Sequence, residues 1–174
     1  MPDIEISPLD PANKDHVELV AQRMHETLIE VLGEERGRDL YSMEWLRNRV
    51  LWHLDPAQCT GQVILAKDRH LDEDGQGEDH VFGHTIVRAE EDAEGNRYGL
   101  FSTTFVIPLL RRVGLASRLL DAGEKWMREQ GLERAVTDTS KTNAKVIQLF
   151  EDRDYEVEVR TEEMLRLSKN IKSP

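Results

Sequence analysis

The segment from Phe105 to Ser117 limits the possible folds more than any other part of the sequence. Its first residues, FVIP, are typical of the end of a strand, and from Leu115 onward apolar residues recur at helical spacing. The turn RRVG joins the two. The first amides of a helix have no partners within the helix and carry a partial positive charge, so they favour anions. The segment therefore predicts a phosphate-binding turn at the start of this helix.

The residue types in this turn also suit an anion. Gly114 allows the backbone to come close to a ligand, and Ala116 keeps the surface small where a larger side chain would block it. Arg111 and Arg112 place positive charge at the turn, in a chain whose formal net charge is -11. The motif R-x-x-G-x-A is short, but it follows a predicted strand and opens an amphipathic helix, which is the geometry that phosphate binding requires.

The order of predicted elements indicates a single α/β domain over residues 1–174 with a mixed sheet. The first helix is expected to have Asp10 as its cap and Pro11 as its first residue. A turn at residues 93–96 predicts an antiparallel hairpin. By approximate residue number, strands are predicted at 4–6, 63–66, 81–87, 98–107, 135–139, 155–159 and 164–167, and helices at 11–33, 42–55, 115–130 and 142–150.

The composition argues against several classes of protein. Hydrophobic residues make up 39% of the chain and charged residues 33%, which is typical of a globular domain. No apolar run reaches the roughly 18 to 20 residues that span a bilayer, and the start MPDIEISPLD lacks the basic and apolar parts of a signal peptide. We therefore expect a cytoplasmic protein without a membrane partner. The negative net charge argues against a nucleic-acid partner and is compatible with a cationic substrate.

An acidic loop is predicted over residues 68–79. It combines six acidic residues with two glycines, so we expect it to be solvated and mobile. His70 and His80 lie within and beside it, but no recognised ligand spacing links them to the acids, and no metal site is expected. The single cysteine, Cys59, cannot form an internal disulfide.

Two motifs together resemble the GNAT superfamily of N-acetyltransferases. The sequence RRVGLA from Arg111 to Ala116 is similar to the acyl-CoA signature Q/R-x-x-G-x-G/A of that family, and the preceding FVIP is similar to the end of its fourth strand. Downstream, Asn143, the sequence LFE at 149–151 and Tyr155 are similar to the family stretch N-x-x-A-x-x-L-Y-E-K-x-G-F. The resemblance covers most of the chain. It implies a mixed, mostly antiparallel sheet flanked by helices, with splayed fourth and fifth strands.

The resemblance implies acetyl-CoA as co-substrate. Val106 and Ile107 would offer backbone groups to the pantetheine arm, which enters the gap between the splayed strands like an added strand. Asn143 would contact the cofactor beyond this gap. Arg111 and Arg112 would lend charge to the pyrophosphate, which would be held by the amides of Arg112, Val113, Gly114, Leu115, Ala116 and Ser117.

The second motif departs from the family at two positions. At the cofactor position where the family often has tyrosine, this chain has Phe150. That tyrosine is commonly assigned to protonate the leaving thiolate, and general acid catalysis is typically worth roughly 10² to 10⁴ in rate. A thiol with a pKa of about 8.5 is a tolerable leaving group, so we expect reduced activity at worst. Asp154 replaces the usual glycine and should alter only a turn.

The sequence indicates the catalytic base and the acceptor pocket less clearly than the cofactor site. An alkylamine with a pKa of about 10.4 loses its proton at a cost of about 4.6 kcal/mol at pH 7, so a base would help. From Gly95 through Leu110 there is no Asp, Glu or His. The candidate bases are His84 on the third strand, Asp138 on the fifth, and Glu26 or Glu30 on the first helix. The candidates for the acceptor pocket are Tyr98, Ser102, Thr103 and Thr104, with Trp45 and Trp52 as a further wall.

The leading hypothesis is an enzyme that moves an acetyl group from acetyl-CoA to a primary amine of a small molecule or peptide, by direct attack in a ternary complex. A backbone amide near Val106 would stabilise the oxyanion. The alternative is an acyl-CoA-binding sensor or regulatory module with little turnover, which Phe150 favours. A nucleotide-binding protein is disfavoured because the chain has neither a P-loop lysine pattern nor G-x-G-x-x-G. Strands at the sheet edge permit a homodimer.

Overall fold

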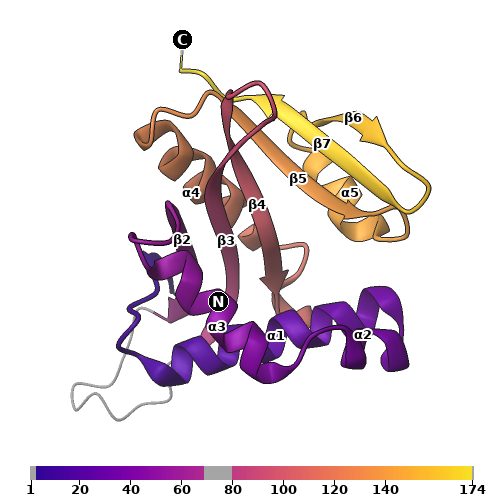
Figure 1. Cartoon of the computed structure of the whole chain (residues 1–174). Helices are drawn as coiled ribbons and strands as arrows, with labels where there is room; N and C mark the ends of the chain where they lie inside the picture. The colour runs from indigo at the N-terminus through magenta and orange to yellow at the C-terminus, as the bar shows by residue number, and fades with distance from the viewer. Residues whose placement is uncertain (1–2, 69–79, 174) are drawn as a thin grey trace.

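The computed structural model describes residues 3–68 and 80–173, which form one mixed seven-stranded sheet with helices on both faces (Figure 1). The strand order is β1-β2-β3-β4-β5-β7-β6, and every neighbouring pair is antiparallel except β4 and β5. The elements are β1 (Ile4–Pro8), α1 (Lys14–Leu32), α2 (Glu34–Leu40), α3 (Met43–Leu54), β2 (Gly61–Asp68), β3 (Val81–Glu91), β4 (Arg97–Val106), the 3-10 helix η1 (Pro108–Leu110), α4 (Leu115–Glu129), β5 (Arg134–Ser140), α5 (Ala144–Glu151), β6 (Glu156–Arg160) and β7 (Met164–Asn170).

All seven predicted strands and the predicted hairpin are confirmed, but two predictions near the N-terminus were wrong. Helix α1 begins after Asn13, whose side chain accepts a hydrogen bond from the amide of His16, whereas Asp10 and Pro11 form a preceding turn. Helix α2 was not predicted. It turns back against α1 so closely that a side chain at Gly37 would meet the backbone of Ile29. A helix of seven residues held by such a contact shows no helical periodicity of apolar residues in its sequence. Of the loop predicted at 68–79, Asp68 is the last residue of β2, and residues 69–79, with His70, lie outside the described residues.

Strands β4 and β5 are paired at one end only. Their parallel pairing covers Gly99 to Phe101 on β4 and ends at Thr137 on β5. Beyond that point β4 continues beside β3 as far as Val106, and β5 continues beside β7, so the two strands diverge (Figure 1). A bulge in β4 opposite Ile86 coincides with the divergence. The predicted splay is confirmed, and it leaves one edge of the lower half of β4 without a neighbouring strand.

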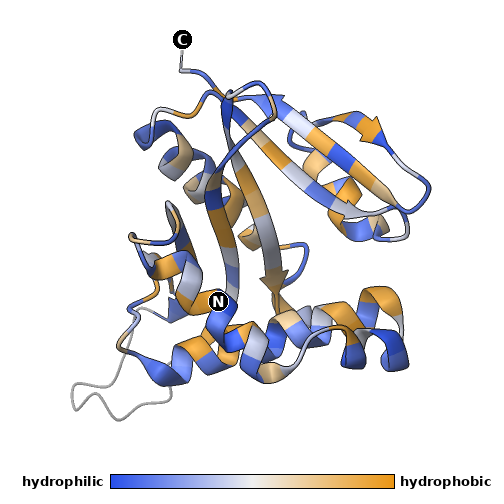
Figure 2. Cartoon of the chain, viewed as in Figure 1, coloured by the Kyte–Doolittle hydropathy of each residue, from blue (hydrophilic) through white to orange (hydrophobic). Residues whose placement is uncertain are grey.

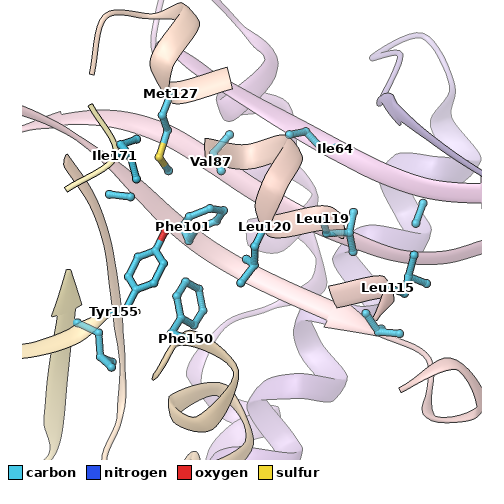
Figure 3. Packing of buried hydrophobic residues seen from close by; sticks show 14 of the residues in the cluster. Ile64, Val87, Phe101, Leu115, Leu119, Leu120, Met127, Phe150, Tyr155 and Ile171 are labelled. Carbon is cyan, nitrogen blue, oxygen red and sulfur yellow. The ribbon is translucent and has the colours of Figure 1, made fainter. Parts of the chain in front are cut away.

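Two hydrophobic clusters fix the helices to the two faces of the sheet. Helices α4 and α5 share one cluster, and α1 and α3 share the other. In the first cluster the ring of Phe150 packs edge-on against Phe101 and Tyr155, with centroids 5.5 and 4.9 Å apart (Figure 3). Each such aromatic pair contributes about 0.5–1.5 kcal/mol beyond its buried area. Phe150 therefore anchors α5 to β4 beside the splay.

Strand β7, between β5 and β6, shows the alternation expected of a strand with one buried face. Along β7, polar residues alternate with apolar ones (Figure 2), and the buried residues are Leu165 and Leu167.

Within the described residues, no helix combines the length and the apolar character needed to cross a bilayer.

Helix α4 also buries a carboxylate, which sequence patterns did not predict. Glu124 is only 2% exposed. Its Oε1 accepts hydrogen bonds from the Tyr155 hydroxyl and the Lys169 ammonium, both at 3.0 Å, and its Oε2 accepts one from Arg153 at 3.1 Å. Burial, followed by this carboxylate, raises the pKa of Tyr155 above its ordinary value. The network ties α4 to β7 and to the residue that precedes β6.

Removal of the Glu124 carboxylate should destabilise the fold strongly. In Glu124→Ala, the Arg153 and Lys169 cations lose their buried partner, and we expect the free energy of unfolding to fall by about 3–5 kcal/mol. Denaturant unfolding measures the change. Glu129→Ala, which removes an exposed carboxylate paired with Lys125 on the same helix, should cost less than about 1 kcal/mol. Similar losses in both variants would contradict the assignment.

Candidate functional site

The splay opens into a cleft with a volume of about 1100 Å³. Its walls come from the unpaired end of β4, the turn before α4, the outer side of α5 and the C-terminal half of α1. Thr104 and Phe105 contribute from β4, Thr27 and Glu30 from α1, and Lys145 from α5. The cleft therefore joins the predicted phosphate-binding turn to the gap between the strands.

The turn before α4 presents its amides at the cleft. Gly114 caps the helix with φ 83°, and Arg112 also has a positive φ of 69°. No side chain caps this helix, and its first backbone hydrogen bond runs from the Arg118 amide to the Gly114 carbonyl. The amides from Leu115 to Ser117 therefore have no helical partners. Because a Cβ placed on Gly114 would meet no atom within 4 Å, the space beside the turn is open.

The structure brings most of the predicted cofactor residues to one cleft. Leu115 and Phe150 instead belong to the hydrophobic core, so only their backbone or their packing can serve the site. Ile107 and Val113 do not line the cleft either. The predicted residues that line it are Val106, Arg111, Arg112, Gly114, Ala116, Ser117 and Asn143.

Arg111 connects three parts of the cleft wall. Its Nε donates a hydrogen bond to the Val106 carbonyl at 2.9 Å, and its guanidinium lies 5.8 Å from the centre of the Phe105 ring. Its Nη1 is 3.8 Å from the Glu30 carboxylate, which also accepts a hydrogen bond from Lys145 at 3.3 Å. Glu30 thus links α1 to both α5 and the turn, and its negative charge is balanced by two cations.

Asn143 has a structural task as well as a place in the cleft. Its side-chain oxygen accepts a hydrogen bond from the Val146 amide at 3.4 Å and so caps α5. Lys145, two residues further along, carries a positive charge into the cleft and was not singled out by sequence patterns. A basic residue in the first turn of a helix is too common a pattern to be distinguished without the fold.

His84 lies beneath the cleft wall, not on it. It is fully buried on β3, its Nε2 is 3.1 Å from the Thr103 hydroxyl, and its ring stacks on Phe105 with centroids 6.0 Å apart. Burial, and then the positive charge of Arg23, lower the pKa of His84 to about 3. The imidazole is therefore neutral at physiological pH, and its Nδ1 is buried without a hydrogen-bond partner.

Asp138 and Tyr98 lie together on another part of the sheet. The Asp138 carboxylate accepts two hydrogen bonds from Arg166, at 2.7 and 2.9 Å, and this pairing raises the pKa of Arg166. The Tyr98 ring is buried beside the guanidiniums of Arg134 and Arg166. Neither Tyr98 nor Asp138 lines the cleft.

The other candidates divide between the cleft and its surroundings. Ser102 lies at the bulge and Thr103 is bonded to His84, and only their neighbour Thr104 lines the cleft. Trp45 and Trp52 line a separate hollow on the outer side of α3. Within residues 3–68 and 80–173, no group of three or more His, Cys, Asp or Glu side chains is placed to hold a metal ion.

Comparisons with solved structures give the same fold. The NatC complex bound to Gag peptide and CoA contains a chain with 15% identity and a TM-score of 0.72, covering 97% of this chain and 98% of that chain. The PaiA N-acetyltransferase of Thermoplasma acidophilum in complex with coenzyme A has 17% identity and a TM-score of 0.69, covering 97% and 99%. An acetyltransferase of the GNAT family from Streptococcus pneumoniae has 18% identity and a TM-score of 0.66, covering 98% and 100%.

At these identities, structural likeness establishes the fold alone. No curated protein sequence matches the chain at a significant level. The family model described as the acetyltransferase (GNAT) family matches residues 21–155, which is well over half of the chain and includes the turn before α4, the splayed strands and α5. The chain therefore belongs to the GNAT acetyltransferase family.

Proposed function

We propose that the protein is an N-acetyltransferase that binds acetyl-CoA in the cleft and transfers the acetyl group to a primary amine. The observation that carries the proposal is the continuity of the cleft, which runs from the open amides of the α4 turn to the unpaired edge of β4. A long cofactor with a diphosphate at one end and a thioester at the other fits this sequence of surfaces. The CoA bound in two of the similar structures supports CoA as the cofactor.

The turn and the unpaired strand would hold different parts of acetyl-CoA. The amides from Leu115 to Ser117 would bind pyrophosphate oxygens, and the exposed Arg112 would add charge. The pantetheine arm would lie along β4 near Val106, in the place where a neighbouring strand would otherwise bond. This places the thioester in the gap beyond Phe101, at the middle of the sheet.

The reaction we propose is a direct transfer. The amine nitrogen attacks the thioester carbonyl carbon, a C–N bond forms, the C–S bond breaks, and CoA leaves as a thiolate. Phe150 has no ionisable proton, and the Tyr155 hydroxyl is bonded to Glu124 with a raised pKa, so the thiolate would take its proton from water. A thiol with a pKa of about 8.5 makes this step feasible near neutral pH.

The amine would also lose its proton without a dedicated strong base. Among the described residues that line the cleft there is no histidine. The carboxylate of Glu30 is held by Arg111 and Lys145, and that of Asp152 accepts a hydrogen bond from Gln148. This absence, together with Phe150, favours a second candidate function: an acyl-CoA-binding sensor or regulatory module with little turnover.

Charge reversal at the turn should abolish cofactor binding under either function. In Arg112→Glu, a carboxylate would face the pyrophosphate, and we expect the affinity for CoA to fall at least a hundredfold by calorimetric titration. Lys125→Glu makes the same change of charge on the exposed side of α4 and should retain wild-type affinity. If Arg112→Glu bound CoA normally, the phosphate site would be misplaced.

Turnover separates the enzyme from the sensor. With acetyl-CoA and a panel of primary amines, we expect release of free thiol that depends on the amine and yields a product heavier by one acetyl group in mass spectrometry. Tight CoA binding without thiol release for every amine in the panel would support the sensor and reject the enzyme.

The titration of His84 should make the free energy of unfolding depend on pH, and His84 should not act as a catalytic base. Its pKa is about 3 in the folded state and about 6.5 when unfolded, so the neutral folded form is fully favoured above pH 6.5 and this stability is lost as the pH falls. In His84→Gln, the free energy of unfolding should depend on pH less steeply between pH 6 and pH 4, by about 1.4 kcal/mol per pH unit. His80→Gln, at an exposed position, is the control. Identical slopes in wild type and His84→Gln would show that His84 is not held neutral.

A further inference from the structure

Arg23 is a partly buried cation without a partner. No hydrogen bond or ion pair in the described part of the chain involves its guanidinium, and its Nη1 is fully buried and unbonded. Burial lowers the pKa of Arg23, although an arginine remains charged at neutral pH. Glu26, an exposed neighbour on α1, attracts the guanidinium but forms no ion pair with it. A buried unpaired charge is costly, so its retention calls for an explanation.

The guanidinium lies against the wall of the cleft. Its central carbon is 5.3 Å from the centre of the Phe105 ring, and Phe105 lines the cleft at the unpaired end of β4. Thr27, which lies one turn further along α1 and whose hydroxyl donates to the Arg23 carbonyl, also lines the cleft. Arg23 therefore lies beside two residues of the cleft wall, although it is not itself a lining residue, and it is separate from the α4 turn where the phosphates would bind.

Two cations and one carboxylate of the cleft wall are already engaged with each other. Arg111 binds the Val106 carbonyl and the Glu30 carboxylate, and Lys145 shares the same carboxylate. Glu30 is consequently balanced and does not offer a free negative charge to a cationic acceptor. Arg23 has no such ion pair among the described residues. Arg112 has none either, but it lies at the α4 turn, where the phosphates would bind.

We propose that Arg23 binds a carboxylate of the acceptor, so that the substrate is a small molecule carrying both a primary amine and a carboxylate. This inference rests on the proposed transferase function and names its substrate class. A guanidinium is a strong donor to carboxylates because its N–H groups match the two oxygens, and the aromatic face of Phe105 keeps it in place. Binding sites for small molecules commonly have volumes of about 300–1000 Å³, so a cleft that also holds the cofactor leaves room for a small acceptor.

The test compares matched acceptors. A series of ω-amino carboxylic acids from glycine to aminohexanoate is assayed by thiol release, each beside the primary amide of the same chain length. We expect kcat/KM for the best acid to exceed that for its amide by at least about tenfold, which is the size of one charge-assisted hydrogen bond. A ratio near one at every chain length overturns the proposal.

Variants assign the preference to Arg23. Arg23→Met keeps an apolar stem over Phe105 and removes the charge, so the ratio of acid to amide should fall to near one, whereas Arg23→Lys should retain part of it. Lys14→Met removes an exposed cation at the start of the same helix and should keep the wild-type ratio. An arginine with only a structural role would lower the midpoint of thermal unfolding when replaced and leave the ratio unchanged, which would overturn the proposal.

Failure of the transferase function gives a different result. If no amine releases thiol although CoA binds, the same acids and amides are titrated calorimetrically into CoA-saturated protein. Binding of an acid, but not its amide, that is lost in Arg23→Met supports the carboxylate site without turnover. Equal binding of acid and amide, or no binding of either, overturns it.

Discussion

The function of this fold depends on a hydrogen-bond ladder that stops early. The parallel pairing of β4 and β5 ends at Phe101 and Thr137, and every later residue of β4 keeps only one neighbouring strand. Unsatisfied backbone groups are costly when buried, so the edge must face either water or a ligand. The rest of the molecule keeps this edge open, since Phe150 fixes α5 over β4 and Glu124 fixes α4 to β7.

Sequence patterns predicted the parts of this arrangement that are local. The turn before α4 was predicted because strand end, glycine and helix start follow each other in sequence, and all seven strands were predicted from alternation and branched residues. The first helix cap was assigned to Asp10 because Asp-Pro is a strong local signal, but the polar Asn13 competes three residues later and makes the bond. Helix α2 escaped prediction because its close contact at Gly37 is a tertiary property.

The charges of the cleft show where such prediction ends. The acids Glu26 and Glu30 were candidates because of their type, and nothing in the sequence indicates that Arg111 and Lys145 balance one of them. Arg23 attracted no attention, since an arginine on an amphipathic helix is ordinarily solvated. Its role depends on how α1 is rotated against Phe105. That rotation is set by the packing of α1 in one hydrophobic cluster with residues of α3, β2 and β3, which are distant in sequence.

Stability and function are divided between the two faces of the sheet. On the face of α4 and α5, the buried Glu124 carboxylate has three donors and the aromatic rings pack edge to face, although the Nε of Arg153 is buried there without a hydrogen-bond partner. On the face of α1, His84 and Arg23 each keep a buried nitrogen without a partner. Unmet donors close to a ligand cleft are expected where binding, and not folding, supplies the missing partner, because proteins tolerate such costs chiefly at functional sites. Arg23 and His84 both contact the ring of Phe105, which lines the cleft, whereas Arg153 lies in the network that fixes α4 and does not line it.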